Sequence, residues 1–330
     1  MPIRLYEAPS IPVVTDRPDF RVSENEPVFN ANTGLARTRF RTAQATPTRP
    51  SLALQACSPP HDLEVGIIYS GERDLMGPLL STMRATAAGL SYRLILVDNA
   101  SDDGVETWRR TIPDTMVLKN SERLNYAANM NRIVAASAAR YVLVMNTDMF
   151  FDPRQNCLAR MVDFMDAHPQ CGIGGCRILH ADGRDARAAR RFQTLSVLLA
   201  RRFGLGRLMQ RTLDRYFYLD HSPGESFDCQ WLSGCFLMLR KTAVEQVGLF
   251  DESFGKYFED VDFCLRMARG GWRVMYHGAT SVYHIEQRAS RRLLSADGWK
   301  HLRSYLYWLR KWGYHAPSGM SCQGLQSRAA

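Results

Sequence analysis

The 330-residue sequence lacks any apolar run of the length that a membrane-spanning helix requires. Such a helix needs about 20 consecutive apolar residues, and stretches such as FLML and SVLLA are far shorter. The first residues, MPIRLYEAPS, also lack the apolar core of a signal peptide. We therefore expect a cytoplasmic protein.

Two further groups of motifs are missing. The eight cysteines include no CxxC pair, which argues against a zinc ribbon and against a disulfide framework. Cys235 and Cys264 stand in apolar runs and are expected to be small core residues in a reducing compartment. Neither GxGxxG nor GxxxxGKS/T occurs, so neither a dinucleotide-binding turn nor a phosphate loop is supported.

The excess of positive charge is only moderate. A formal net charge of +9 is too small to demand nucleic acid, and we expect no nucleic-acid partner. This charge suits an anionic small substrate, an anionic lipid surface, or both.

The sequence does contain enough apolar residues for a substantial core. Hydrophobic residues make up 45% and aromatic residues 10% of the chain, which suggests one large domain or two smaller ones. Residues 1–61 differ, because Pro, Thr, Arg, Asn and Ala dominate there and no apolar period persists. We expect them to form a partly disordered N-terminal extension.

From residue 62 onward, short strand-like segments alternate with helical ones. Strands are expected at 64–70, 93–97, 115–119 and 141–145, and helices at 74–88, 104–110, 126–138 and 156–167. This alternation predicts an α/β fold with a largely parallel sheet. In such sheets, ligands bind beyond the carboxyl ends of the strands.

Two acidic loops follow predicted strands. One begins at Asp98 and continues through Asn99 to Ser101 and Asp102, and the other is Asn146-Thr147-Asp148. An Asp at a strand end can accept hydrogen bonds from a base or ribose, and a second can hold a divalent cation beside a diphosphate. The alternative is that both loops are Asx turns that cap the following helices.

The segment FGKYFEDVDFCLRMARGGWRV, residues 254–274, carries three carboxylates at a predicted helix start: Glu259, Asp260 and Asp262. The positive end of the helix dipole favours acids there, but three within four residues exceed what capping needs. Adjacent acids in a cleft often supply a general base, because their repulsion separates their affinities for protons. The alternative is a solvated acidic helix start.

The second half of the chain also carries two basic segments. Asp182-Gly183 is a hairpin signal, and residues 184–215 contain nine arginines interleaved with Phe and Leu. This stretch is either an interfacial helix on anionic lipid or a helix whose apolar face packs on the domain. Near the C-terminus five apolar residues recur at helical spacing, for which we favour domain packing over membrane contact: Trp299, Leu302, Leu306, Leu309 and Trp312.

Together these pieces resemble the family 2 glycosyltransferases with the GT-A fold, and look closest to the bacterial rhamnosyltransferase-like branch that builds cell-surface polysaccharide. The resemblance rests on VDNAS, on NTD after a hydrophobic strand, on the long block from Trp231 to Val274, and on His284 after the next strand. It covers about residues 62–290, which would comprise a nucleotide-binding half (62–150) and an acceptor half (151–290). Residues 291–330 would form a helical tail.

The resemblance implies roles for individual residues. Asp260 would be the catalytic base of an inverting reaction, and Asp148 and His284 would bind Mg²⁺ or Mn²⁺. The acceptor and sugar site would include Trp231, Gly234, Glu259 and Asp262. The donor site would include Tyr69, Ser70, Asp98, Asn99, Ser101, Asn131, Asn146 and Thr147.

The sequence departs from the family pattern at three places. Ser70 follows Tyr69 where an Asn is usual, and Asn125 stands where a Gly is common. The DxD-like motif reads Asn146-Thr147-Asp148 and keeps one carboxylate, so the metal is expected to depend on His284 and on the diphosphate of the donor.

The expected reaction moves a sugar from a nucleotide diphosphate, with dTDP-rhamnose first and a UDP-hexose or UDP-galactofuranose next. The acceptor would be a lipid-linked or growing glycan at the inner face of the cytoplasmic membrane. A bound cation stabilises the departing diphosphate, and one carboxylate deprotonates the acceptor hydroxyl. Two alternatives remain open: a sugar-1-phosphate nucleotidyltransferase and a degenerate nucleotide-sugar binder that serves as a partner subunit.

Overall fold

The computed structural model describes residues 61–87, 89–110, 114–202, 204–285 and 296–313, all within the unit of chain from residue 56 to 330. The predicted extension lies outside the described residues except for residue 61. So do residues 286–290 at the end of the predicted catalytic domain, and residues 291–295 and 314–330 of the predicted tail.

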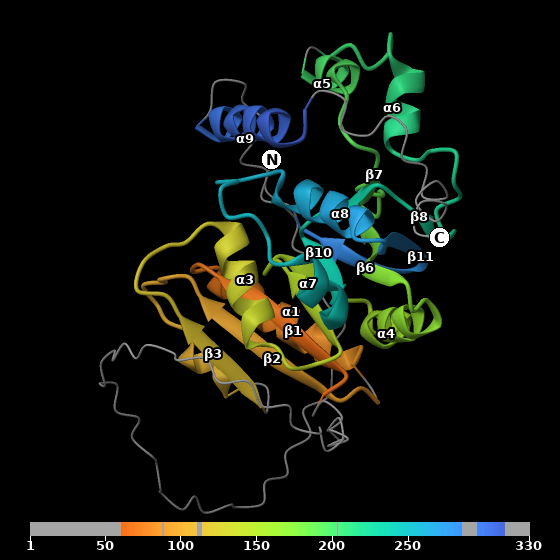
Figure 1. Cartoon of the computed structure of the whole chain (residues 1–330). Helices are drawn as coiled ribbons and strands as arrows, with labels where there is room; N and C mark the ends of the chain where they lie inside the picture. Colours follow the sequence, from red (N-terminus) through yellow and green to blue (C-terminus); the bar gives the residue numbers. More distant parts are fainter. Residues whose placement is uncertain (1–60, 88, 111–113, 203, 286–295, 314–330) are drawn as a thin grey trace, which may run out of the picture. The chain divides into compact units, whose positions relative to one another are not determined.

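A mixed sheet forms the centre of the fold, with the order β3-β2-β1-β4-β10-β6-β11-β5 and with β8 beside β11 (Figure 1). β7 and β9 pair separately as a two-stranded ribbon. The strands are β1 Leu63–Tyr69, β2 Tyr92–Asp98, β3 Thr115–Lys119, β4 Tyr141–Met145, β5 Met149–Phe150, β6 Cys171–Leu179, β7 Ala189–Arg190, β8 Phe227–Asp228, β9 Trp231–Leu232, β10 Phe236–Arg240 and β11 Arg273–His284.

The helices lie between these strands and after them (Figure 1). They are α1 Arg73–Ala85, α2 Glu106–Arg109, α3 Tyr126–Ala136, the 3₁₀ helix η1 Pro153–Gln155, α4 Cys157–Ala167, α5 Leu195–Arg202, α6 Gln210–Tyr216, α7 Lys241–Val247, α8 Glu259–Arg269 and α9 Ala296–Trp312. Of those in the described ranges, none is both long and apolar enough to pass through a bilayer.

The predicted α/β alternation is confirmed in the first half of the domain. β3 and β4 have the expected bounds, and β1 and β2 differ from them by one residue at each end. Six strands run in one direction, and β10 enters the middle of the sheet antiparallel to both β4 and β6. β11, which ends at His284, is 12 residues long, because its pairing with β6 continues across a register shift after His277.

Small residues let other elements approach the sheet closely. A Cβ on Gly174 of β6 would meet Met161 and Met165 of α4, whereas one on the next residue, Gly175, would meet Leu232 of β9. Because successive strand residues face opposite sides of a sheet, α4 and the β7–β9 ribbon cover opposite faces. The ribbon thereby lies on the face where α8 packs against β6, β9 and β11.

Two expectations about the basic segments need correction. The described part of residues 184–215 forms no single helix but contains β7, α5 and α6. In α9 the apolar residues predicted to pack on the domain include three exposed ones, Trp299, Leu302 and Leu306. Leu309 and Trp312 do pack against the core, partly buried, together with the buried Ser304 and Trp308. Helical spacing alone did not distinguish them from the exposed residues, because this helix has apolar residues on two sides.

Candidate active site

Chain segments far apart in sequence meet at the carboxyl end of β4. Phe236, which opens β10, pairs antiparallel with Met145, the last residue of β4. This register sets Gly234 and Cys235 beside the loop that follows β4, and the Asn146 N–H donates to the Cys235 carbonyl at 3.2 Å. Cys235 is therefore half-buried beside this loop and packs at the edge of the core, whereas Cys264 is fully buried as expected.

Asp148 and His284 meet although 136 residues separate them in sequence. The antiparallel pair β5–β11 sets His284 opposite Met149, and His284 Nε2 lies 3.0 Å from Asp148 Oδ1. Burial lowers the pKa of the His284 imidazole, but its hydrogen bonds with Asp148 and Cys235 outweigh burial and raise that pKa to about 10. Without a bound cation His284 is therefore protonated near neutral pH, and a metal ion that binds its ring nitrogen must displace that proton.

Glu259 and Asp260 open α8 after a strained turn. Tyr257 and Phe258 have φ values of 71° and 70°, a left-handed conformation that costs energy for non-glycine residues and clusters at functional sites. Asp260 Oδ2 accepts from the Gly234 N–H at 2.9 Å and Oδ1 from the Val261 N–H at 2.8 Å. These two bonds fix the carboxylate, whereas the buried Oε2 of Glu259 accepts no hydrogen bond from the described residues.

Burial raises the pKa of both acids. The pKa of Glu259 rises to about 8 through burial and the neighbouring charge of Asp260. Burial also raises the pKa of Asp260, but the N–H groups of Gly234 and Val261 and the charge of Arg190 partly oppose it. Near neutral pH these two neighbouring acids therefore differ: Glu259 keeps its proton and Asp260 is ionised. This agrees with the expectation that repulsion between adjacent acids separates their affinities for protons.

Tyr126 is a residue of this site that the sequence analysis missed. Its hydroxyl lies 2.9 Å from Asn146 Oδ1 and 3.0 Å from the Gly234 carbonyl, and so joins α3, the loop after β4 and the start of β10. Burial and the surrounding acidic groups raise its pKa well above the ordinary value. The only sequence signal was its position after Asn125, whose side chain caps α3 by accepting from the Ala128 N–H.

The predicted donor residues at the first two strand ends are connected to one another. Asn99 accepts from the Leu124 N–H at 2.8 Å, and its amide lies 3.4 Å from Ser70 Oγ. The buried Asp98 caps its loop by accepting from the Ser101 N–H, and Tyr69 donates to Asp103. A hollow of about 270 Å³ lies beside them, lined by residues 71–75.

Of three further predicted site residues, two use their polar groups to bind other parts of the protein and the third is buried. Asn131 bonds both backbone groups of Phe250 and thereby fixes α3 to the loop before α8. The fully buried carboxylate of Asp262 is paired with Arg266 and with Lys311 of α9, and Thr147 is buried in the loop after β4. Their predicted roles toward substrate stay predictions.

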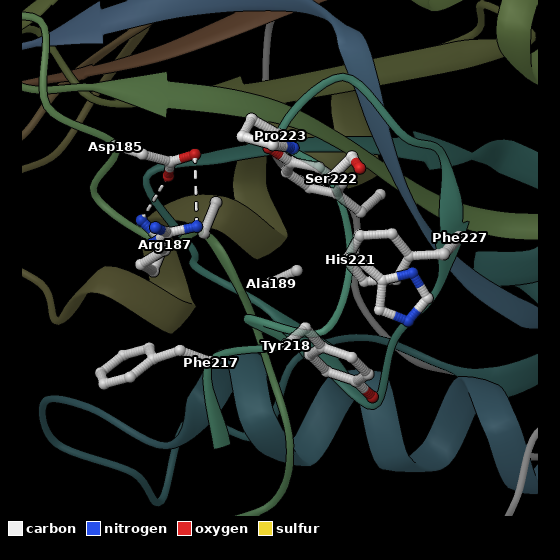
Figure 2. Close-up of a pocket in the computed structure, with 11 residues that line it drawn as sticks. Asp185, Arg187, Ala189, Phe217, Tyr218, His221, Ser222, Pro223 and Phe227 are labelled. Atoms are coloured by element: carbon white, nitrogen blue, oxygen red, sulfur yellow. Dashed lines mark hydrogen bonds and ion pairs between the residues drawn. The ribbon is translucent and has the colours of Figure 1, made fainter. Parts of the chain in front are cut away.

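A separate small pocket lies beside β7, with Ala189 in its lining. It is lined by Asp185, Arg187, Tyr218, His221 and Phe227 among others, with Asp185 and Arg187 joined as drawn in Figure 2. Its volume of about 20 Å³ holds one water molecule. It contains none of the predicted site residues, so the cluster at the end of β4 is the candidate active site.

The donor set suits a hard divalent cation shared with a substrate. Mg²⁺ is usually held by one or two carboxylates plus substrate phosphates, and Asp148 and His284 offer one carboxylate and one imidazole. The part of the chain that the structure describes gathers no group of three His, Cys, Asp or Glu side chains around one point. The residues therefore fit a cation whose other ligands are phosphate oxygens and water.

Comparison with curated proteins reveals relatives along most of the described domain. An N-acetylglucosaminyl-diphospho-decaprenol L-rhamnosyltransferase of Mycobacterium tuberculosis is 28% identical over 242 residues, which cover 69% of this chain and 77% of that protein. The rhamnosyltransferase WbbL of Escherichia coli is 31% identical over 81 residues, which cover 24% of this chain and 31% of WbbL.

Solved structures share the fold at low identity. A crystal structure of GalNAc-T7 with UDP, GalNAc and Mn²⁺ matches with a TM-score of 0.53 and 13% identity, over 82% of this chain and 54% of that one. The mannosyltransferase PcManGT from Pyrobaculum calidifontis, in complex with GDP-Man and Mn²⁺, matches with a TM-score of 0.50 and 17% identity, over 82% and 79% of the two chains. The fold is GT-A, as expected.

The family model for glycosyl transferase family 2 matches residues 65–248, more than half of the chain. The match includes the loops after β2 and β4, whereas Glu259, Asp260 and His284 lie beyond it. With the expected fold and the rhamnosyltransferase relatives, this match confirms the resemblance: the chain is a glycosyltransferase and belongs to glycosyl transferase family 2.

Proposed function

We propose that this enzyme transfers a deoxyhexose, with inversion, from a nucleotide diphosphate to a sugar that is linked through a diphosphate to a membrane lipid. The observation that carries the proposal is that two pairs of polar residues lie near the carboxyl end of β4. Asp148 and His284 suit a cation and its diphosphate, and Glu259 and Asp260 supply one fixed, ionised carboxylate.

A single base is sufficient for inversion. The ionised Asp260 takes the proton of the acceptor hydroxyl while that oxygen attacks from the face opposite the leaving diphosphate. Glu259 keeps its proton near pH 7 and so adds no second charge beside the base. When bound, the cation stabilises negative charge on the leaving diphosphate, and Asp148 with His284 would hold it.

The substrates are inferred from the relatives. Two of them are named rhamnosyltransferases, and one name specifies an acceptor in which N-acetylglucosamine is joined to decaprenol through a diphosphate. We therefore place dTDP-rhamnose first among donors, before a UDP-hexose or UDP-galactofuranose. The product would enter a cell-surface polysaccharide, in line with the name of an O-antigen biosynthesis relative from Myxococcus xanthus.

An acceptor anchored in lipid implies work at the inner face of the cytoplasmic membrane. The basic α5–α6 segment and α9, with its exposed Trp299, Leu302 and Leu306, are the surfaces that we assign to an anionic bilayer. Their support is charge complementarity, because exposed arginines accompany the exposed apolar residues on both elements.

Family membership favours transfer over the two alternatives raised by the sequence. A sugar-1-phosphate nucleotidyltransferase has no need of a paired acid at a helix start, and a degenerate binder has no need to fix Asp260 with two N–H donors.

The test is a transfer assay with the full-length protein. Sugar nucleotides are offered with Mg²⁺ or Mn²⁺ and a short-chain polyprenyl-diphospho-N-acetylglucosamine, and the anomeric configuration of the product is read by NMR. Transfer with inversion is expected. Binding of sugar nucleotides without transfer to any lipid-linked acceptor, or transfer with retention, would overturn the proposal.

A further inference from the structure

The β7–β9 ribbon sets Arg190 within electrostatic reach of Asp260. Arg190 pairs with Trp231 across the ribbon, and its guanidinium lies 4.9 Å from the centroid of the Trp231 ring. That ring is buried and donates its Nε1–H to the Arg191 carbonyl at 2.7 Å. β9 then leads through Ser233 to Gly234, whose N–H holds Asp260, so one short ribbon fixes both the arginine and the base.

The guanidinium of Arg190 is oriented but not neutralised. Its Nε donates to the Arg187 carbonyl at 2.9 Å, which leaves both terminal nitrogens available. Within the described ranges no carboxylate forms an ion pair with it, whereas three nearby arginines each lie within 4 Å of an aspartate: Arg184 with Asp182, Arg187 with Asp185 and Arg191 with Asp220. A half-buried arginine without a counter-charge is suited to an anionic ligand.

The position of Arg190 indicates that the anionic ligand belongs to the acceptor. The charge of Arg190 acts on Asp260, and the hydroxyl that loses its proton must lie within hydrogen-bond reach of Asp260. An acceptor that carries phosphate would be repelled by the ionised Asp260 unless a cation stood next to it. A guanidinium presents parallel N–H groups that match phosphate oxygens.

We propose that Arg190 binds the diphosphate that joins the acceptor sugar to its lipid and thereby selects phosphorylated over uncharged acceptors. This inference rests on the proposed function and adds to it the recognition of one acceptor group. The donor carries a diphosphate of the same chemistry, but Asp148 and His284 are the residues suited to that one, with a cation.

The experiment compares Arg190→Gln, Arg190→Lys and, as a matched control from the same arginine-rich stretch but outside α5 and α6, Arg184→Gln, which alters an exposed side chain. KM is measured for a short-chain polyprenyl-diphospho-N-acetylglucosamine and for an uncharged alkyl glycoside of the same sugar. Arg190→Gln should raise KM for the phosphorylated acceptor about 10- to 100-fold, as expected when charge-assisted hydrogen bonds are lost. KM for the uncharged acceptor should not change, Arg190→Lys should cause a smaller rise in KM for the phosphorylated acceptor, and Arg184→Gln should cause none.

Each other outcome overturns the inference. An equal rise in KM for both acceptors would mean that Arg190 supports the fold. A raised KM for the sugar nucleotide, measured in the hydrolysis reaction without acceptor, would assign Arg190 to the donor diphosphate. A shifted pH profile with unchanged KM would make it a modulator of Asp260 alone. Nucleotide-sugar binding and thermal unfolding check the fold of each variant, and Arg190→Lys is used for the test if the Gln variant does not fold.

Calorimetric binding of the phosphorylated acceptor distinguishes this inference from the proposed function. If the wild type binds this acceptor more tightly than Arg190→Gln but transfers no sugar to it, the proposed function is refuted and the binding site at Arg190 is supported. Equal binding by both proteins would refute the site whatever the turnover.

Discussion

At the scale of single residues, two adjacent carboxyl groups are made chemically different by their hydrogen bonds. Asp260 receives N–H donors from Gly234 and Val261, so its charged form is stabilised at a buried position. Oε2 of Glu259 has no such donor among the described residues, and its carboxyl keeps a proton to about pH 8. The residue that looks redundant in sequence therefore protects the site from a second charge.

Asp260→Asn should abolish transfer while nucleotide-sugar binding is retained, because an amide cannot accept the proton of the acceptor. The expected loss is at least about 100-fold in kcat, the usual minimum for general-base catalysis. Steady-state kinetics with binding as the control checks it, and a variant that keeps more than about a tenth of the wild-type rate would remove Asp260 from this role.

Glu259→Gln should behave like wild type near pH 7, because the amide resembles a protonated carboxyl in shape. Above about pH 8 the wild-type Glu259 loses its proton and adds negative charge near the site of the diphosphates. Hence kcat/KM of the wild type should fall on that alkaline side, and the Gln variant should not show this fall. A variant that is inactive at pH 7 would show that Glu259 itself handles a proton or contacts substrate.

The same shift has a consequence for stability. The folded state binds the Glu259 proton more tightly than the unfolded chain, in which this carboxyl has its ordinary pKa of 4.5. This group therefore makes stability fall as pH rises from that value to about 8. Glu259→Gln removes this contribution, and its melting temperature relative to wild type should increase from pH 5 to pH 8.

Asp148 and His284 act through one cation in the proposed reaction. Asp148→Ala and His284→Ala should each weaken Mn²⁺-dependent nucleotide binding, and the double variant should lose less than the sum, because both residues act on one ion. Titration of nucleotide with and without Mn²⁺ measures this coupling. Additive losses, or full activity in excess chelator, count against a shared metal.

At the scale of elements, α9 supports the turn that presents the acid pair. Phe258, in its left-handed conformation, packs against Trp308 and Tyr305 of α9, with ring centroids 6.0 and 5.7 Å apart. Lys311 of the same helix lies 2.8 Å from Asp262 Oδ1 and 2.6 Å from Asp251 Oδ2. This helix therefore anchors both the strained turn and the first turn of α8.

Trp308→Ala should lower the free energy of unfolding by about 3–5 kcal/mol, the usual cost of removing a large buried aromatic side chain. It should also lower kcat more than nucleotide affinity, because the turn at Tyr257 and Phe258 loses its support. Trp299→Ala on the same helix is the matched control, since that side chain is 66% exposed, and it should change stability by about 0.5 kcal/mol or less. Denaturant unfolding and kinetics at a temperature far below the transition measure both.

Sequence reasoning was sufficient where local pattern determines structure, as for β4 and the loop that ends in Asp148. The pairing of Asp148 with His284 followed from the family resemblance. Tyr126 and Cys235, and the role that we propose for Arg190, were missed because each of these residues reaches the site through contacts with distant segments. Asp262 looked like part of an acidic cluster, since its partner Lys311 lies 49 positions later in the chain and no periodicity connects them.

At the scale of the whole molecule, the proposed acceptor requires the enzyme to work on a bilayer surface. Trp299, Leu302 and Leu306 recur at helical spacing on α9 and are 66%, 42% and 56% exposed. Arg303 and Arg310 are exposed on the same helix. Apolar side chains that enter the headgroup region beside arginines are typical of interfacial helices.

Replacing Trp299, Leu302 and Leu306 together by Ser should reduce binding to vesicles that contain anionic lipid, and should slow transfer to a long-chain acceptor embedded in them. Hydrolysis of the sugar nucleotide and transfer to a short-chain acceptor in solution should stay at the wild-type level, because these side chains are exposed and do not support the core. Each basic residue near an anionic surface contributes about 1 kcal/mol, so wild-type binding should also weaken as salt rises. Sedimentation with vesicles measures the binding, and a triple variant that sediments like the wild type would show that α9 does not meet the membrane.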